Sequence, residues 1–287
     1  MAEAIHTYAR DLEQLRGGVQ IIVGTPGRIM DHLRRKTLSL EALKMVVLDE
    51  ADEMLRMGFI EDVEWILAHA PGPFQTALFT ATMPKEVRRL ASRYLKDPVA
   101  VAIQPTLVTV PATEQYYLNV PAISKLQGLT QVLESEPIQT VLIFVRTKIG
   151  AADLAEQLQV RGDAAEALHG DMGQAARESV MRRLRTGEIE ILVATDVAAR
   201  GLDVPLISHV VNYDISWDPE AYVHRIGRTG RAGRGGKAIL LVTPREQRLL
   251  REIERYIGQR LRPMKLPTKA AMVARRIALS KINFARC

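Results

Sequence analysis

The chain has 287 residues, of which 47% are hydrophobic, and a formal net charge of +6. This length predicts about two domains, and the apolar content is typical of a globular protein with buried cores. No stretch is long and apolar enough to span a bilayer, so we expect no membrane partner. The single cysteine, Cys287, excludes an internal disulfide. That fits a reducing compartment, and we expect a cytoplasmic protein.

The positive charge is concentrated near the carboxyl end of the chain. Residues 261–287 contain seven lysines and arginines and no acidic residue, so the rest of the chain has a net charge of −1. A basic tail often contacts nucleic acid. Two interpretations of this segment stay open, a nucleic-acid contact and the solvated face of a helix. We expect a truncated basic extension, which could also bind protein partners or a second copy of the chain.

Short runs rich in valine and isoleucine predict strands in the first third of the chain, and the segments between them have helical patterns. The expected strands are Val19–Val23, Met45–Leu48, Thr76–Phe79 and Val99–Ile103. A helix is expected at Lys85–Tyr94. Residues 104–114 contain Pro105 and Pro111 and lack periodicity, which predicts a linker between two domains.

The remainder of the chain shows a more complete alternation of the same kind. Strands are expected at Thr140–Val145, Ala164–Leu168, Ile189–Ala194, Ile207–Asn212 and Ala238–Val242, with helices at Lys148–Gln159 and Gln174–Arg185 among others. Strands buried on both faces that alternate with helices indicate a parallel sheet. We therefore expect an α/β fold with two parallel-sheet domains in tandem. The first, residues 1–103, looks like the C-terminal part of a larger domain, and the second covers 115–260.

Two carboxylates follow the apolar strand at Met45–Leu48, in the string Asp49-Glu50-Ala51-Asp52. Ligands of open α/β sheets bind beyond the carboxyl ends of strands. Mg²⁺ takes one or two carboxylates together with waters and substrate phosphates. Asp49 is therefore expected to hold a magnesium ion through its water shell, and Glu50 to orient or deprotonate an attacking water. The alternative is a strand that simply ends in a polar turn.

Two hydroxyl residues, Thr80 and Thr82, follow the next expected strand. They could hydrogen-bond Asp52 and connect this pocket to the second domain. The alternative is an ordinary strand end in which Thr82 caps the helix that follows Pro84. Taken alone, this pair of residues favours the alternative.

A glycine-rich stretch later in the chain carries regularly spaced arginines, in the string His224-Arg225-Ile226-Gly227-Arg228-Thr229-Gly230-Arg231 with Arg234 close behind. Guanidinium groups bind phosphate oxygens in a bidentate manner, and an arginine finger stabilises the charge on a transferred phosphoryl group. The alternative is a solvated basic loop. So many arginines without an anion would repel one another, so we favour phosphate binding at Arg228 and Arg231.

Three further strings combine a helix start with polar or cationic residues. Thr195 and Asp196 follow an apolar strand and could cap a phosphate-binding helix, and Asp203 is a candidate acceptor for a ribose hydroxyl. The other two strings are Thr25-Pro26-Gly27-Arg28 and Gly170-Asp171 with Gln174 and Arg177. Each string alone is also compatible with an ordinary capped helix.

Taken together, these strings resemble the motifs of DEAD-box ATP-dependent RNA helicases, in the family's order and spacing, over about residues 10–258. The matching strings are Thr25 to Arg28, Asp49 to Asp52, Thr80 to Thr82, Phe144, Gln174 to Arg177, Ala194 to Asp203 and His224 to Arg231. The run from Asp49 to Phe59 also looks like the bacterial cold-shock subgroup. The resemblance implies two RecA-like domains and an enzyme that uses ATP and Mg²⁺ to unwind or remodel RNA.

The resemblance also implies a role for each matching residue. Asp49 and Glu50 would be the magnesium and catalytic acids, and Arg228 and Arg231 the arginine fingers. Asp203 would contact the ribose. Coupling between ATP and RNA is implied for Asp52, Thr80, Thr82 and His224. RNA contacts, made to phosphate and sugar with little sequence specificity, are implied for Thr25, Gly27, Arg28, Gly170, Arg177 and Thr195.

Two departures from the family's pattern limit what the resemblance implies. The motif that usually begins with serine begins here with Thr80, which keeps the hydroxyl. No Gly-rich loop ending in Lys-Ser/Thr precedes Thr25. We therefore expect a truncated chain that does not hydrolyse ATP alone. A non-catalytic RNA-binding or interaction module is the second hypothesis, and a DNA helicase is disfavoured by the DEAD-box strings.

Overall fold

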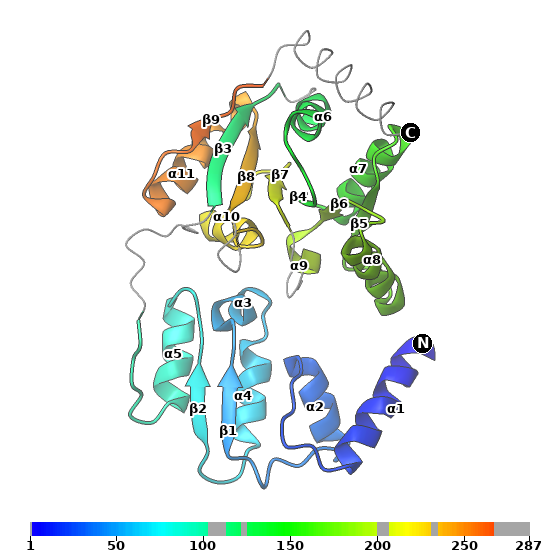
Figure 1. Ribbon diagram of the computed structural model, residues 1–287. Helices are drawn as coiled ribbons and strands as arrows, with labels where there is room; N and C mark the ends of the chain where they lie inside the picture. Colours follow the sequence, from blue (N-terminus) through cyan, green and yellow to red (C-terminus); the bar gives the residue numbers. More distant parts are fainter. Residues whose placement is uncertain (1, 103–112, 122–124, 200–206, 231–234, 267–287) are drawn as a thin grey trace. The chain divides into compact units, whose positions relative to one another are not determined.

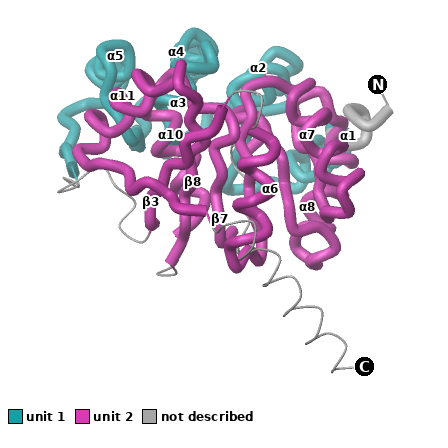
Figure 2. Tube along the Cα trace, turned by 90° about the horizontal axis from the view of Figure 1, so that it is seen from above, with its two compact units in different colours: residues 1–103 teal, residues 104–287 magenta. Residues whose placement is uncertain are grey.

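The computed structural model describes residues 2–102, 113–121, 125–199, 207–230 and 235–266. The chain forms two compact units, residues 1–103 (unit 1) and residues 104–287 (unit 2), which are coloured separately in Figure 2. Both units have parallel strands connected by helices (Figure 1). The α/β class with two parallel sheets is thus confirmed. No helix within the described ranges has the length and apolarity needed to cross a membrane.

Unit 1 contains a two-stranded parallel sheet in which Met45 pairs with Gln75 and Leu48 with Leu78. Its elements are α1 (Ala2–Arg16), α2 (Pro26–Arg34), β1 (Met45–Leu48), α3 (Ala51–Arg56), α4 (Ile60–Ala68), β2 (Gln75–Leu78) and α5 (Lys85–Tyr94). Apolar residues recur on α4 at Ile60, Val63 and Leu67, which is helical spacing. These side chains are buried with Leu48 and with Leu90 of α5 in one small core.

Unit 2 contains a seven-stranded parallel sheet with the order β5-β6-β4-β7-β8-β3-β9. The strands are β3 (Thr113–Asn119), β4 (Val141–Phe144), β5 (Ala165–Leu168), β6 (Ile191–Ala194), β7 (His209–Asn212), β8 (Gly236–Val242) and β9 (Arg262–Pro263). The helices are α6 (Lys125–Ser135), α7 (Lys148–Val160), α8 (Gln174–Thr186), α9 (Asp196–Ala199), α10 (Pro219–Ile226) and α11 (Gln247–Ile257).

Alternate side chains of the central strands point to opposite faces of this sheet, and helices cover both faces. On β4, Val141 and Ile143 pack in the core that includes residues of α6 and α7, whereas Leu142 and Phe144 pack in the core that includes α8 and α9. A third core joins β8 to α10 and α11. This two-sided burial explains why the strands read as continuous apolar runs in the sequence.

Two expected strands of the first third are wrong. Residues 19–24 form neither helix nor strand, and the side chains of Ile21 and Val23 are 83% and 92% exposed. Residues 99–102 form no strand either, and Ile103 lies outside the described residues. A strand needs a neighbouring strand for its backbone hydrogen bonds. In the described part of unit 1, β1 and β2 pair only with each other.

The expected boundaries of the second half also need correction at both ends. β3 begins at Thr113, so the last two residues of the expected linker, Thr113 and Glu114, belong to the sheet. The expected basic extension begins inside the domain, because β9 at Arg262–Pro263 pairs with Tyr116 and Tyr117. The other expected strands and helices of unit 2 lie within a few residues of their observed bounds.

Candidate functional site

The carboxyl end of β1 presents Asp49 and Glu50, both exposed. Glu50 has φ 53° and ψ 49°, the left-handed conformation that residues other than glycine adopt rarely. Its backbone N–H donates to Asp49 Oδ1 at 2.9 Å, and Glu50 occupies the N-cap position of α3. The sharp strand-to-helix turn therefore leaves two carboxylates together at the strand end, where the sequence predicted them.

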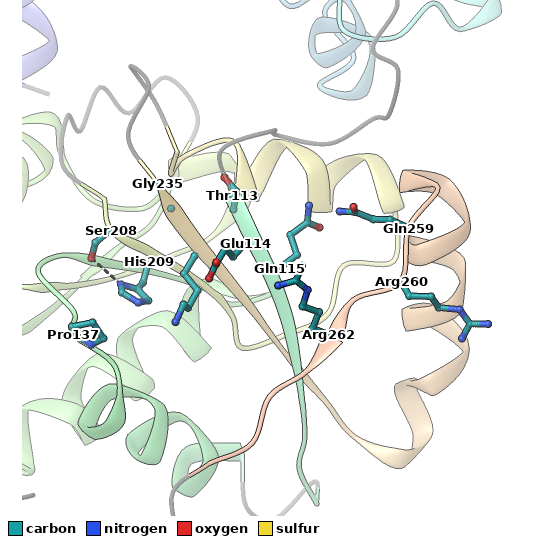
Figure 3. Close-up of a pocket in the computed structure, with 12 residues that line it drawn as sticks. Thr113, Glu114, Gln115, Pro137, Ser208, His209, Gly235, Gln259, Arg260 and Arg262 are labelled. Atoms are coloured by element: carbon teal, nitrogen blue, oxygen red, sulfur yellow. Dashed lines mark hydrogen bonds between the residues drawn. The ribbon is translucent and has the colours of Figure 1, made fainter.

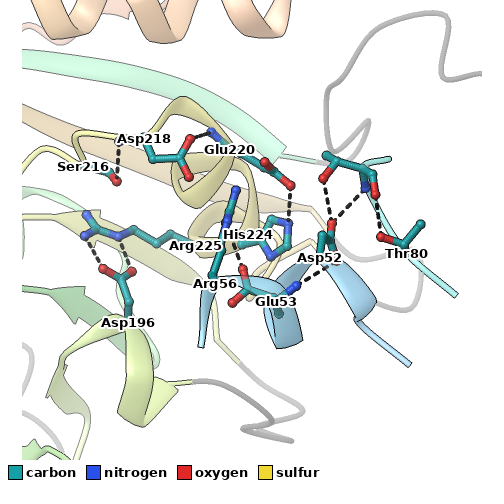
Figure 4. A network of polar contacts seen from close by, with 11 residues as sticks. Asp52, Glu53, Arg56, Thr80, Asp196, Ser216, Asp218, Glu220, His224 and Arg225 are labelled. Atoms are coloured by element: carbon teal, nitrogen blue, oxygen red, sulfur yellow. Dashed lines mark hydrogen bonds and ion pairs between the residues drawn. The ribbon is translucent and has the colours of Figure 1, made fainter. Parts of the chain in front are cut away.

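Asp52, in the first turn of α3, is connected to the segment that follows β2. The backbone N–H and the hydroxyl of Thr82 donate to Asp52 Oδ2 at 2.8 Å and 3.0 Å (Figure 4). Thr80 donates its hydroxyl to the Thr82 carbonyl. The N-cap of α5 is Pro84, so the alternative in which Thr82 caps that helix is wrong.

These contacts change the acidity of Asp52. Burial raises its pKa, but hydrogen bonds from Thr82, Thr80 and the Glu53 backbone outweigh this effect and hold the pKa below its ordinary value. Asp52 is therefore ionised at neutral pH and acts as an acceptor for the threonines. The structure brings together three of the residues that the sequence grouped as a coupling site, namely Asp52, Thr80 and Thr82.

The string Thr25 to Arg28 lies at the start of α2. Thr25 has the extended backbone of an N-cap, but its side chain makes no capping hydrogen bond, and it is exposed together with Gly27. Arg28 is already engaged within unit 1. Its Nε lies 3.2 Å from Asp11 Oδ2, and its guanidinium lies 5.3 Å from the ring centre of Tyr8. A phosphate that binds Arg28 would have to compete with Asp11.

In unit 2, the candidate residues lie at the carboxyl edge of the sheet. Gly170 follows β5 and is exposed, and Thr195 directly follows β6, the neighbouring strand. Arg177, in the first turn of α8, donates to the Ala198 carbonyl at 3.4 Å. These residues come from separate strings of the sequence, and the parallel order β5-β6 places Gly170 and Thr195 at adjacent strand ends.

Arg225 is the first arginine of the basic string, and the structure shows that its guanidinium is engaged within unit 2. Arg225 is 4% exposed, and its Nε and one terminal nitrogen donate to the two carboxylate oxygens of Asp196 at 2.6 Å and 2.7 Å (Figure 4). Its other terminal nitrogen donates to Asn212 Oδ1 at 3.0 Å and to the Asp214 carbonyl at 2.7 Å. Arg225 is therefore a buried structural residue and is not directed at a phosphate.

The sequence did contain a signal for this role. Tyr222, Arg225 and Ile226 are the buried residues of α10, and their spacing of three and four marks one helix face. An arginine on an apolar face needs a buried acceptor, and Asp196 follows the apolar strand β6. Asp196 was interpreted as a helix cap instead.

The loop after α10 begins in a fixed position. The hydroxyl of Thr229 donates to the Ile207 carbonyl at 2.6 Å, and a Cβ on Gly236 would lie only 2.4 Å from that hydroxyl oxygen. Arg228 donates its backbone N–H to the Arg225 carbonyl at 3.1 Å. His224 Nε2 lies 3.9 Å from Glu220 Oε1 on the same helix. Arg231 and Asp203 lie outside the described residues.

Comparison with known proteins identifies both units. Residues 4–90 match the family described as DEAD/DEAH box helicase, and residues 124–233 match the helicase conserved C-terminal domain. Structures of Saccharomyces cerevisiae Dbp5 bound to RNA and ADP BeF3 share 35% identity with a TM-score of 0.80, covering 91% of this chain and 69% of that one. The chain belongs to the DEAD-box RNA helicase family.

Bacterial DEAD-box proteins have higher sequence identity. The DEAD-box ATP-dependent RNA helicase CshA of Geobacillus kaustophilus is 52% identical over 275 residues, which cover 95% of this chain and 59% of that protein. The ATP-dependent RNA helicase DeaD of Mycobacterium tuberculosis is 52% identical over 272 residues, with 95% and 48% covered. The chain thus spans about half the length of the curated relatives it matches. The neighbours support a RecA-like fold for its parallel-sheet units.

A pocket of about 640 Å³ lies at the amino-terminal edge of the unit 2 sheet (Figure 3). This edge is opposite the carboxyl edge that carries Gly170 and Thr195. Its lining includes His209 and Lys237, at the starts of β7 and β8. Lys237 Nζ lies 2.6 Å from Glu136 Oε2. Burial lowers the pKa of His209, although Glu136 partly offsets this effect. Among the predicted site residues that the structure describes, none lines this pocket.

Proposed function

We propose that this chain is the motor region of an ATP-dependent RNA helicase, which unwinds or remodels RNA duplexes with the energy of ATP hydrolysis. The observation that carries the proposal is the arrangement after β1. Asp49 and Glu50 are exposed at the strand end, and Asp52 accepts two hydrogen bonds from Thr82. A pure binding module would have no use for this acidic turn. Relatives named ATP-dependent RNA helicases support the same proposal.

The acidic turn fits a magnesium–nucleotide complex, because exposed carboxylates are ligands that Mg²⁺ prefers. Asp49 would hold the ion through its water shell, and the bound ion would neutralise charge on the phosphates. Glu50 would orient the attacking water and accept its proton. We assign the arginine fingers to Arg228 and Arg231 and the ribose contact to Asp203. These roles rest on the family resemblance.

RNA binding is proposed for exposed and partly exposed residues in both units. In unit 1 these are Thr25, Gly27 and Arg28, and in unit 2 they are Gly170, Arg177 and Thr195. Asp52, Thr80, Thr82 and His224 would couple RNA binding to hydrolysis. Contacts to phosphate and sugar make binding largely independent of sequence. Since RNA and ATP are both present there, we propose the cytoplasm as the location.

The 287 residues contain no Gly-x-x-x-x-Gly-Lys-Ser/Thr string. That loop supplies the backbone N–H groups and the lysine that hold the β- and γ-phosphates. We therefore propose that this chain of 287 residues binds RNA but hydrolyses ATP negligibly. RNA-stimulated ATP hydrolysis clearly above that of a Glu50→Gln control would contradict this part of the proposal.

RNA binding is tested by titrating a fluorescent single-stranded RNA at several salt concentrations, with DNA of the same sequence beside it. Arg177→Ala should weaken RNA binding and lower the slope of log K against log salt by about 1, since one phosphate contact is lost. Arg248→Ala, an exposed arginine on α11, is the control. Equal binding of RNA and DNA, with no effect of Arg177→Ala, would reject the proposal.

A further inference from the structure

Trp217 is the largest side chain exposed on the segment that connects β7 to α10, with 67% of its surface accessible. Its neighbours Ile215 and Ser216 are buried. A tryptophan with so much exposed apolar surface is a candidate contact for a ligand. Nothing in the motifs of the sequence predicted a role for it.

The segment that carries Trp217 is held rigidly within unit 2. Asp214 Oδ2 accepts the backbone N–H of Arg146 at 3.0 Å, and the Asp214 carbonyl accepts from the buried Arg225 at 2.7 Å. Asp218 donates its backbone N–H to Ser216 Oγ at 3.2 Å and caps α10 through its carboxylate. Trp217 is thus presented in a fixed position, which lowers the entropic cost of binding a partner.

One side of the Trp217 ring is next to a cation. The guanidinium carbon of Arg146 lies 4.8 Å from the ring centre, and this side chain also reaches the Ile215 carbonyl at 3.4 Å. Arg146 follows β4 and is exposed. An exposed aromatic ring beside an arginine is the combination that binds single-stranded nucleic acid, since the ring stacks on a base and the cation attracts the backbone.

The platform formed by Trp217 and Arg146 lies on the edge where we propose RNA binding. In the sheet order β5-β6-β4-β7, the strand ends carry Gly170, Thr195, Arg146 and the Trp217 segment in that sequence. Neighbouring strands are about 4.8 Å apart, so this row extends roughly 14 Å, the reach of two to three nucleotides. We propose that an unpaired RNA base stacks on Trp217 at the end of this row, an inference that rests on the proposed RNA-binding function.

The proposal is tested in the full chain by the fluorescence of Trp217. The chain has two tryptophans, so a Trp65→Phe variant leaves Trp217 as the only one. Single-stranded RNA should quench its emission, whereas inorganic polyphosphate, which has the charge but no base, should not. In the RNA titration, Trp217→Ala should weaken binding about tenfold. Trp217→Phe, which keeps an aromatic ring, should retain most of the affinity.

The outcomes separate this proposal from the broader one. If RNA binds and Arg177→Ala weakens it, but Trp217 emission and the Trp217→Ala affinity are unchanged, the stacking platform is rejected and the RNA-binding function stands. Equal quenching by polyphosphate would also reject base stacking. If no RNA binds at all, both proposals fail. A melting temperature of Trp217→Ala equal to that of the parent chain would show that the variant is folded.

Discussion

Glu50 combines a strained backbone with a position at the carboxyl end of a strand. An L-residue in the left-handed region costs roughly 1–2 kcal/mol, because its Cβ approaches the following carbonyl oxygen. Such strain persists at sites where the surrounding structure fixes it, and it is often found at active sites. In this chain the Ala51 N–H donates to the Phe79 carbonyl at 3.1 Å, which fixes the turn immediately after Glu50.

Replacing Glu50 with glycine and with alanine should separate backbone strain from loss of the carboxylate. Both variants lose the proposed catalytic group, but only glycine adopts φ 53° without strain. We expect Glu50→Gly to be more stable than Glu50→Ala by about 1 kcal/mol, after allowing for the greater freedom of glycine in the unfolded chain. Urea unfolding followed by Trp65 fluorescence, in a Trp217→Phe background, measures the difference. An alanine variant as stable as the glycine variant would show that the turn carries no strain.

At the residue scale, the sequence predicted which side chains gather at strand ends but not which of them are buried. The acidic turn after β1 and the Asp52–Thr82 contact follow from the rule that polar residues at adjacent parallel strand ends lie together. Arg225 was grouped with Arg228 because both belong to one basic string. Burial of an arginine depends on a distant acceptor, Asp196, which pattern alone does not identify.

In unit 2, α10 is connected to its neighbours by several polar contacts of one buried residue. Arg225 joins α10 to Asp196 at the start of α9, to Asn212 at the end of β7 and to the Asp214 carbonyl. Asp196 and Arg225 form a bidentate ion pair, in which the two carboxylate oxygens of Asp196 face two nitrogens of the planar guanidinium. Removal of one partner would leave the other charge or acceptor without compensation.

Arg225→Ala should therefore destabilise unit 2 by about 3 kcal/mol, the lower end for a buried pair because Asp196 is partly exposed. Arg248→Ala is the matched control, because its i,i+4 pair with Glu252 is on the surface and should contribute at most about 1 kcal/mol. Trp217 fluorescence in a Trp65→Phe background reports urea unfolding of unit 2. Equal midpoints for the two variants would refute the structural role of Arg225.

The elements that the sequence predicted well are those buried on both sides. Continuous apolar runs located β4 and β6, and the pair Val210-Val211 located β7, because both faces of these strands pack against helices. The run at residues 19–23 has the same composition but no neighbouring strand among the described residues. The opposite error affected β3, a strand that the sequence did not predict. Its residues Thr113, Glu114 and Gln115 are polar. Its place in the sheet depends on β8, far along the chain.

The two units differ in how much apolar surface they bury. Unit 2 has helices on both faces of seven strands. Unit 1 has two paired strands and exposes Ile21, Val23, Val47, Phe79 and Val99. Burial of apolar surface stabilises a fold by roughly 25 cal/mol per Å². Apolar surface that stays in water does not contribute this stabilisation. We therefore expect unit 1 to be the less stable unit.

Urea unfolding should show two transitions, the first reported by Trp65 in unit 1 and the second by Trp217 in unit 2. The two single-tryptophan variants measure them separately. Residues 113–266 expressed alone should unfold at the same urea concentration as unit 2 in the whole chain. Coincident transitions, or unfolding of Trp217 before Trp65, would contradict the predicted order of stability.

The parallel pairing of β3 with β8 has a consequence for how the protein is made. β3 is the first strand of unit 2 to be synthesised, yet Thr113 pairs with Gly236 and Tyr116 with Arg262. At typical synthesis rates the partner strands emerge on the order of ten seconds later. During that time β3 is an unpaired strand on a growing chain. Its polar first residues and Asn119 disfavour pairing with other nascent chains, so their polarity protects a strand whose burial must wait until β8 and β9 have been synthesised.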